Sequence, residues 1–229
     1  MFGTSLCLAV LTLLEAETAE VVTRQTVWEF LSSGGPVMVP IAICSIVALA
    51  FGLERLMNLK EHKVVPERID QAVELLRIGQ PDKAMSYSEE MDLPASHILA
   101  AGIRRWGRPL EDIERAMEDQ GHKENEKLRS NIRPLHIIAN VAPLLGLLGT
   151  VMGIQESFHR VVKSGLGKPE HLAGGIEEAL VTTISGLVVA IPALLLAAHL
   201  SAKVRKLMIR TDEKLAPVVE LLEGEHAPY

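Results

Sequence analysis

Two threonines and a glutamate stand inside or beside long apolar runs of this chain, where polar side chains are costly. Thr150 lies within VAPLLGLLGTVMG (141–153), and Thr183 lies within a second run that begins just after Glu178. A hydroxyl can relay a proton by donating and accepting hydrogen bonds, but it holds no charge at neutral pH. An ionisable residue at the border of a membrane segment marks an ion pathway by default. These residues therefore indicate a proton path, although Glu178 also fits a plain helix start.

Further polar residues accompany the second run. At about 100° per residue, Thr182 and Ser185 share a helix side with Glu178. Their hydroxyls either pack against the helix, bonded to the carbonyl three or four residues back, or line the path as secondary polar residues. His199 lies near the far end of this run, where it can be an interfacial histidine or a proton acceptor.

Small residues on one helix face explain the glycines of the first run. Gly146, Gly149 and Gly153 recur at spacings of three and four, and Thr150 lies on the same side. Each glycine would weaken a soluble helix, but in lipid small residues let helix backbones approach closely. We therefore predict a helix-packing face at these positions.

The two runs match level by level when they are paired as antiparallel helices. Counted from the acidic residue at the outer end of each run (Glu156 in the first), Thr150 and Thr183 lie six and five residues deep. At about 1.5 Å rise per residue, the two hydroxyls are expected within a couple of ångströms in depth. By the same count, the helix-perturbing Pro143 and Pro192 lie thirteen and fourteen residues deep.

Three long windows without Asp, Glu, Lys or Arg must hold these residues in place. They cover residues 30–53, 134–155 and 179–202. A helix needs roughly 20 mostly apolar residues to cross a bilayer core about 30 Å thick. We therefore predict an all-α membrane protein with three transmembrane helices, rather than a soluble protein with buried helices.

The basic residues favour one threading of these helices. Lys and Arg concentrate after the first window, before the second and after the third, which is typical of cytoplasmic loops. The N-terminus is therefore expected outside and the C-terminus inside. The predicted regions are an N-terminal periplasmic or interfacial segment (1–29), the first span (30–57), a cytoplasmic helical region (58–132), the second span (133–160), a periplasmic loop (161–173), the third span (174–202) and a cytoplasmic C-terminal helix or tail (203–229).

The cytoplasmic region is polar, charged and helical in pattern. Breaks are expected at Gly79–Pro81 and near Gly107–Pro109. The helix after the second break is expected to run without a stop into the second span. Most charges here are expected to form a solvated face, with a minority contacting a partner or a neighbouring subunit.

The first residues, MFGTSLCLAVLTLLEAETAE, contain an apolar run too short to cross a bilayer. This run resembles the centre of a signal peptide, but no Lys or Arg precedes it. A retained amphipathic or interfacial segment and a cleaved signal both remain open.

Composition excludes several other functions. The net charge is −6, and no basic cluster is interleaved with aromatic residues, which argues against a nucleic-acid partner. Cys7 and Cys44 both lie in apolar runs and form no metal or disulfide pattern. Since no convergent Ser/His/Asp, Cys/His or metal-ligand spacing is present, we expect neither an enzyme nor a cofactor.

Two quoted segments carry a family likeness. APLLGLLGTVMGIQESF (142–158) followed by GGIEEALVTTISGLVVAIPALLLA (174–197) resembles the ExbB/TolQ/MotA proton-channel family, closest to its ExbB/TolQ branch. The three-span layout with an outer N-terminus also resembles that family. The resemblance implies that Thr150 and Thr183 face the pore and that Glu178 is the acidic residue of an I-x-E-A-L motif.

The same resemblance implies an assembly in the bacterial inner membrane. Family members form rings of five three-span subunits around two copies of a single-span ExbD- or TolR-type partner. An Asp of the partner takes and releases protons, and the ring couples the proton-motive force to work on the cell envelope, through the partner to an energy-receiving protein. Proton is the expected ion, and sodium is the alternative. Pro143 and Pro192 match the paired prolines of the family.

The chain departs from the family pattern at two places. Ala197 and Ala198 stand where a Tyr-Asn pair is common, and Thr182 and Ser185 stand where many members have small apolar residues. The inner exit route and the subfamily are therefore open. A non-conducting membrane scaffold that uses the same small-residue faces for assembly is the alternative function.

Overall fold

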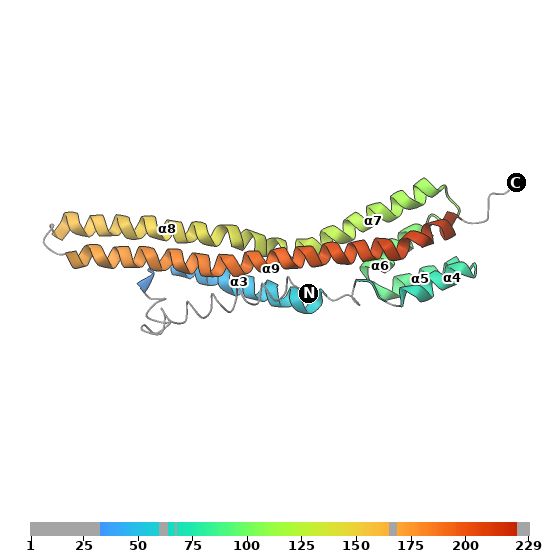
Figure 1. Ribbon diagram of the computed structural model, residues 1–229, viewed down its shortest axis with the longest axis horizontal. Coiled ribbons are helices and arrows are strands. Elements are labelled where there is room, and N and C mark those ends of the chain that lie inside the picture. The colour runs from blue at the N-terminus through green and yellow to red at the C-terminus, as the bar shows by residue number, and fades with distance from the viewer. Residues whose placement is uncertain (1–32, 60–63, 67, 165–168, 224–229) are drawn as a thin grey trace. The chain divides into compact units, whose positions relative to one another are not determined.

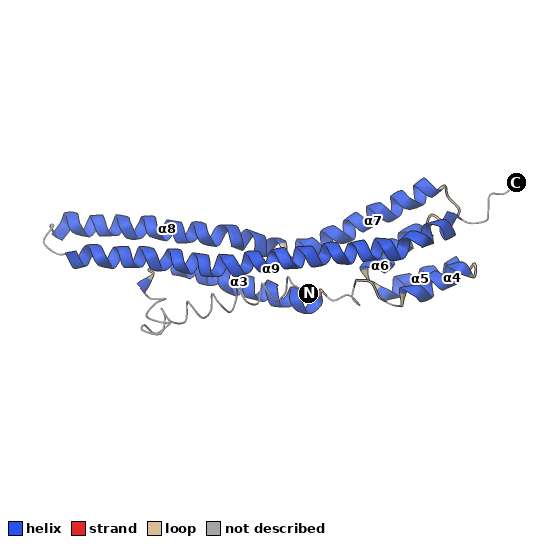
Figure 2. Ribbon diagram, viewed as in Figure 1, coloured by secondary structure: helices blue, strands red, loops and turns tan. Residues whose placement is uncertain are grey.

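The computed structural model describes residues 33–59, 64–66, 68–164 and 169–223, and side chains are not described for 164 and 169–172. The predicted N-terminal segment 1–29 lies outside the described residues. Within the described part, every regular element is a helix (Figure 2). The helices are α3 (Met38–Asn58), α4 (Ile69–Arg77), α5 (Pro81–Met91), α6 (Pro94–Ile103), α7 (Leu110–Ser130), α8 (Arg133–Ser164) and α9 (Pro169–Glu223).

Three of these helices are long and apolar enough to cross a membrane. They are α3, α8 over Arg133–Lys163, and α9 over Ala173–Glu223. Each contains one of the three charge-free windows or most of it. The prediction of an all-α chain with three membrane helices is confirmed, and the protein is an integral membrane protein.

The expected unbroken helix from the cytoplasmic region into the second span is wrong. α7 ends at Ser130 and α8 begins at Arg133, with Ile132 N–H donating to the carbonyl of Arg129 at 2.9 Å in the turn between them. Pro134 is consistent with a helix start at this point, because proline lacks an N–H and is best tolerated in the first turn of a helix. The breaks predicted near Gly79–Pro81 and Gly107–Pro109 are confirmed by the bounds of α4 to α7.

The first compact unit contains α8, most of α3 and the N-terminal half of α9. α8 (yellow) and this half of α9 (orange) run side by side (Figure 1). One apolar cluster joins Ile138, Ala139 and Ala142 of α8 to Ala190 and Ala193 of α9. The four alanines of this cluster let the two helices approach closely, and larger apolar side chains of α8 and α9 are exposed, as expected for surfaces that face lipid.

The second compact unit contains α4 to α7 and the C-terminal part of α9. Its core is apolar and draws on all five helices. The buried members are Ile69, Ala72, Leu76, Ala84, Ala95, Ile98, Leu99, Ile103, Ile113, Met117, Leu215, Val218 and Leu222. Gly107, with φ +71°, donates its N–H to the carbonyl of Leu222 at 3.1 Å and so fixes the turn before α7 against α9.

A buried carboxylate, Glu124, ties α6 to α7 in this unit. Its Oε1 lies 3.0 Å from Nδ1 of His97 and accepts hydrogen bonds from Gln120 and Lys127 at 2.9 Å each. The other ring nitrogen of His97 lies 2.9 Å from the Asp92 carboxylate. A buried charge is tolerated only when it is paired and hydrogen-bonded in this way.

Candidate functional site

The glycines of α8 form the predicted packing face, and the face is turned to α9. A Cβ at Gly146 would lie 3.0 Å from the carbonyl oxygen of Thr182, and one at Gly153 would lie 2.8 Å from the carbonyl oxygen of Gly175. At Gly149 a Cβ would collide with the side chain of Thr182. Only glycine lets the backbones approach to this distance, so the small-residue face sets the α8–α9 separation.

The register of the two helices differs from the expected one by about one turn. Gly146 lies opposite Thr183, with its added Cβ 3.1 Å from the Thr183 Cα, whereas Thr150 lies four residues further along α8. The two predicted hydroxyls are therefore offset by about 6 Å in depth rather than by a couple of ångströms. The level count was wrong because Gly175, not Glu178, packs against the residue next to Glu156, namely Ser157.

The hydroxyls of Thr150 and Thr183 both donate to backbone carbonyls of α8. Thr150 Oγ1 donates to the Leu147 carbonyl at 2.6 Å within its own helix, and Thr183 Oγ1 donates across to the Gly146 carbonyl at 3.2 Å. Thr183 is thus a hydrogen-bonded link between the two helices and not only a surface hydroxyl.

Thr150 also opens onto an apolar pocket of about 390 Å³ between α8 and α9. Its other walls are Ile154, Ser157, Phe158, Ile176, Ala179 and Leu180. Thr183 is not among the lining residues, so the structure brings the two threonines to one helix pair but not to one pocket.

Thr182 and Ser185 are buried, and their hydroxyls are bonded to their own helix. Thr182 Oγ1 donates to the Ala179 carbonyl at 2.9 Å, and Ser185 Oγ donates to the Val181 carbonyl at 2.8 Å. These contacts favour the packing interpretation. A place for the two residues in an ion path stays a prediction.

Glu178 lies at the edge of a larger cavity, of about 760 Å³, in the first unit. The cavity is lined by Glu178 of α9, by the turn that precedes α3 and by the outer part of α8, including Glu156 and His159. The carboxylate of Glu178 is in contact with Gly35, three residues before α3 begins. The unpaired N–H groups and positive dipole of a helix N-terminus favour a carboxylate at this position.

The other predicted residues have weaker links to the site. Pro143 and Pro192 lie inside α8 and α9, and neither ends its helix. His199 is exposed and belongs to the second unit, apart from the other site residues. Ser157 was missed, although it follows Gly153 by four residues; it is buried and donates to the Gly153 carbonyl at 2.9 Å.

The charge-free windows of α8 and α9 contain no acidic side chain that could hold a proton. The windows 134–155 and 179–202 carry no carboxylate, and no cluster suited to a metal ion occurs among the described residues. The hydroxyls can pass a proton along hydrogen bonds, but no group at this depth can store one. Along their charge-free windows, α8 and α9 therefore supply hydroxyls and no carboxylate.

Comparison with known proteins also indicates a proton channel family. Residues 90–213 match the family described as the MotA/TolQ/ExbB proton channel family. The chain is 38% identical over 176 residues to an ExbB-like biopolymer transport protein of Synechocystis, covering 73% of this chain and 67% of that protein. It is 30% identical over 199 residues to the biopolymer transport protein ExbB1 of Vibrio cholerae, covering 81% and 83%.

A solved structure has a similar fold. The structure of MotAB from C. jejuni superimposes with a TM-score of 0.57 and 21% sequence identity, over 93% of this chain and 87% of that chain. At this identity, the likeness concerns the arrangement of the helices alone.

Proposed function

Because the chain belongs to the MotA/TolQ/ExbB proton channel family, we propose that it is the ExbB/TolQ-like subunit of a proton-driven motor in the bacterial inner membrane. A proton-channel subunit of a motor is what the family membership supports. The specific proposal is that the motor couples the proton-motive force to mechanical work on the cell envelope, in transport or in envelope energisation.

The observation that carries this proposal is the α8–α9 helix pair. It places the Thr150 hydroxyl beside an apolar pocket and the Thr183 hydroxyl in the contact between the helices, and the charge-free windows that hold them contain no acid. A single-span partner of ExbD or TolR type supplies the missing Asp. Five copies of this chain surround two copies of the partner, and the work reaches an energy-receiving envelope protein through that partner.

The energy available to such a motor is modest for each ion. One elementary charge crossing the membrane supplies about 2.3 kcal/mol per 100 mV. A few protons per step are therefore enough to move a packed interface between two arrangements, but not enough to unfold it.

The proposed orientation follows the basic residues. Lys123, Lys127 and Arg129 precede α8, while Lys203 and Arg205 follow the last charge-free window. We place both groups in the cytoplasm and the residues between α8 and α9 in the periplasm. The cavity beside Glu178 then opens on the periplasmic side, where protons enter.

The decisive experiment measures proton flux in proteoliposomes that contain this chain and its partner. Thr150→Val with Thr183→Val removes both hydroxyls at nearly constant volume, and we expect flux to fall while the complex still assembles. Thr211→Val is the matched control, because its hydroxyl donates to the Leu207 carbonyl at 3.0 Å in the same helix, outside the charge-free window. Unchanged flux in the double variant would contradict the hydroxyl relay.

The same preparation separates the alternatives. A non-conducting scaffold gives no partner-dependent flux in any variant, although it assembles normally. A sodium-driven channel conducts only when sodium is present, so replacing sodium with potassium on both sides distinguishes it from a proton channel.

A further inference from the structure

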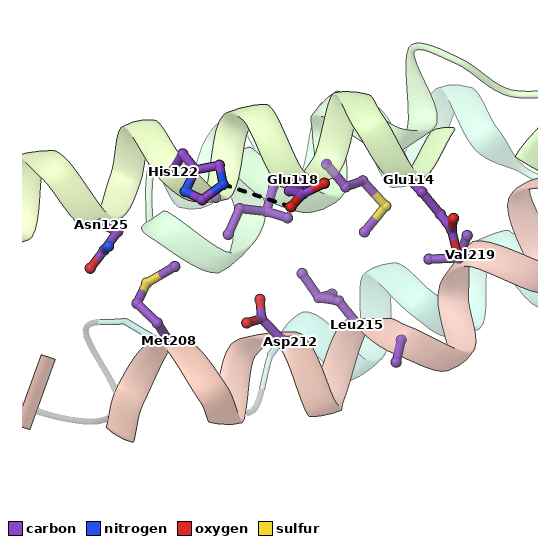
Figure 3. Close-up of a pocket in the computed structure, with 12 residues that line it drawn as sticks. Glu114, Glu118, His122, Asn125, Met208, Asp212, Leu215 and Val219 are labelled. Atoms are coloured by element: carbon purple, nitrogen blue, oxygen red, sulfur yellow. Dashed lines mark ion pairs between the residues drawn. The ribbon is translucent and has the colours of Figure 1, made fainter. Parts of the chain in front are cut away.

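A groove in the second unit is not used by the proposed proton path. It lies between α7 and the C-terminal part of α9 and encloses about 470 Å³ (Figure 3). In the close-up, His122 and Glu118 lie along α7 as an ion pair, the Glu114 carboxylate lies beside Val219, and Asp212 points from α9 toward α7. We name this feature the acidic groove, defined by its lining: Ile98, Glu114, Met117, Glu118, Gly121, His122, Asn125, Met208, Asp212, Leu215, Ala216 and Val219.

The floor of the acidic groove is apolar. Met117 and Leu215 belong to the buried core of the unit, and Met208 and Val219 pack against that core from the side. Methionine side chains adapt readily to the shape of an incoming apolar group, which is why they are frequent at docking surfaces. A floor of this kind suits the apolar face of a helix.

The rim of the acidic groove is mainly acidic, with His122 3.7 Å from Glu118. Glu114 and Glu118 lie four residues apart on α7, and Asp212 faces them from α9. None of the described lining residues is Lys or Arg. A basic residue of α9 near this height, Lys214, is directed instead to Asp70 of α4, at 3.0 Å.

We propose that the acidic groove docks a basic amphipathic helix of the single-span partner, from the segment that flanks its span on the cytoplasmic side. The proposal rests on the proposed function, which supplies the partner and the orientation. The apolar face of that helix lies on the methionines, and its Lys or Arg side chains pair with Glu114, Glu118 and Asp212. Glu114 and Glu118 lie four residues apart on α7, so basic residues four apart on the docked helix can pair with both of them.

The distance to the membrane fits such a segment. Asp212 lies ten residues beyond Ala202, the last residue of the third charge-free window, which is about 15 Å along α9. A helical segment of about ten residues covers the same distance. Basic residues concentrate within roughly 15–20 residues of the cytoplasmic end of a span, so the partner has its positive charge at the height of the groove.

The raised pKa of Asp212 is consistent with a carboxylate that would gain a Lys or Arg neighbour when the helix docks. Burial raises the pKa of the Asp212 carboxyl above its ordinary value of 3.8, against the opposing effect of His122. A Lys or Arg side chain placed beside this carboxyl would lower the pKa again. Protonation of Asp212 should therefore weaken docking.

Site-specific photocrosslinking in the complete complex tests this docking. The full-length chain, with p-benzoylphenylalanine at Asn125 in the groove, is coexpressed with its partner and irradiated in nanodiscs. The matched control places the same crosslinker at Lys123, which is exposed and outside the groove. We expect a product at position 125 only, mapped by mass spectrometry to the partner residues that precede its span.

Charge reversal in the same sample tests the rim. Glu118→Lys with Asp212→Lys should reduce the crosslinked product several-fold, whereas Glu111→Lys with Glu213→Lys, an equal change at exposed positions outside the groove, should not. A product with a second copy of this chain, equal yields at both crosslinker positions, or no product overturns the docking. If the crosslink is absent but partner-dependent proton flux persists, only the docking is overturned and the proposed function stands. If the partner fails to copurify with this chain, both the docking and the proposed function are overturned.

Discussion

The carboxylate of Glu178 on α9 lies against the backbone of Gly35, which is the turn residue before α3. Gly35 has φ +64°, and a Cβ added there would fall on Oε1 of Glu178. The turn therefore does two things: it leads into α3, and it leaves space for the carboxylate beside the 760 Å³ cavity. The first span is in this way joined to the candidate ion path.

Gly35→Ala should displace Glu178 as well as strain the turn. A side chain in the left-handed region costs roughly 1–2 kcal/mol, and the added methyl group also requires the carboxylate to move. We expect lower thermal stability and lower proton flux in proteoliposomes. Gly79→Ala is the control, since Gly79 has φ +71° with nothing within 4 Å, and it should lose stability without losing flux. Equal flux in both variants would disconnect the turn from the path.

Gly149→Ala should separate α8 from α9. The new Cβ would lie 2.5 Å from Cβ of Thr182, and overpacking of this kind costs about 1–3 kcal/mol. The measurement is the apparent melting temperature of the purified chain in nanodiscs. Gly174→Ala, in open space on α9, should not lower it. Adding Thr182→Ala should restore part of the loss, because it removes two of the three clashing atoms, and no restoration would argue against this contact.

Glu124→Ala should destabilise the second unit more than any exposed ion pair does. It leaves Gln120, His97 and Lys127 without their shared acceptor, and the loss should be about 1–3 kcal/mol. The comparison is Glu118→Ala, whose exposed pair with His122 is 3.7 Å long and worth about 0–1 kcal/mol. Hydrogen exchange of α6 and α7 amides reports the difference, and equal protection in the two variants would contradict the role of Glu124.

Asp212→Asn should raise stability by an amount that depends on pH. Since burial raises the folded-state pKa of Asp212 above 3.8, its proton stabilises the folded chain below that pH. The contribution is lost as the pH rises through the raised pKa. The neutral Asn variant should therefore melt slightly higher than the parent at pH 7 and equally at about pH 3.5. A lower melting temperature at pH 7 would mean that Asp212 is stabilised by a partner charge.

The helices and the packing face could be predicted because they depend on local composition. Charge-free windows predict spans, and glycines spaced three and four apart predict a close contact wherever another helix lies. The register of that contact could not be predicted. It depends on how far the ends of α8 and α9 are staggered. Counting residues from Glu156 and Glu178 assumed that these two glutamates lie at the same depth, and they do not.

Other features were misjudged for different physical reasons. Glu124 lies in a run of charges that is typical of a solvated surface, and only the fold brings His97 beneath it. The break before α8 had a local signal in Pro134, which the prediction of an unbroken helix did not take into account. Close contact of Glu178 with Gly35 joins residues distant in sequence, so no spacing rule indicates it.

The absence of a carboxylate from the charge-free windows of α8 and α9 has a consequence for the cell that makes this protein. Under the proposed function, a ring of this subunit inserted without its partner would have hydroxyls but no acid in these windows, and we expect it to conduct no protons. We therefore expect overproduction of this subunit alone to leave the membrane potential intact, and a proton leak to require the partner as well.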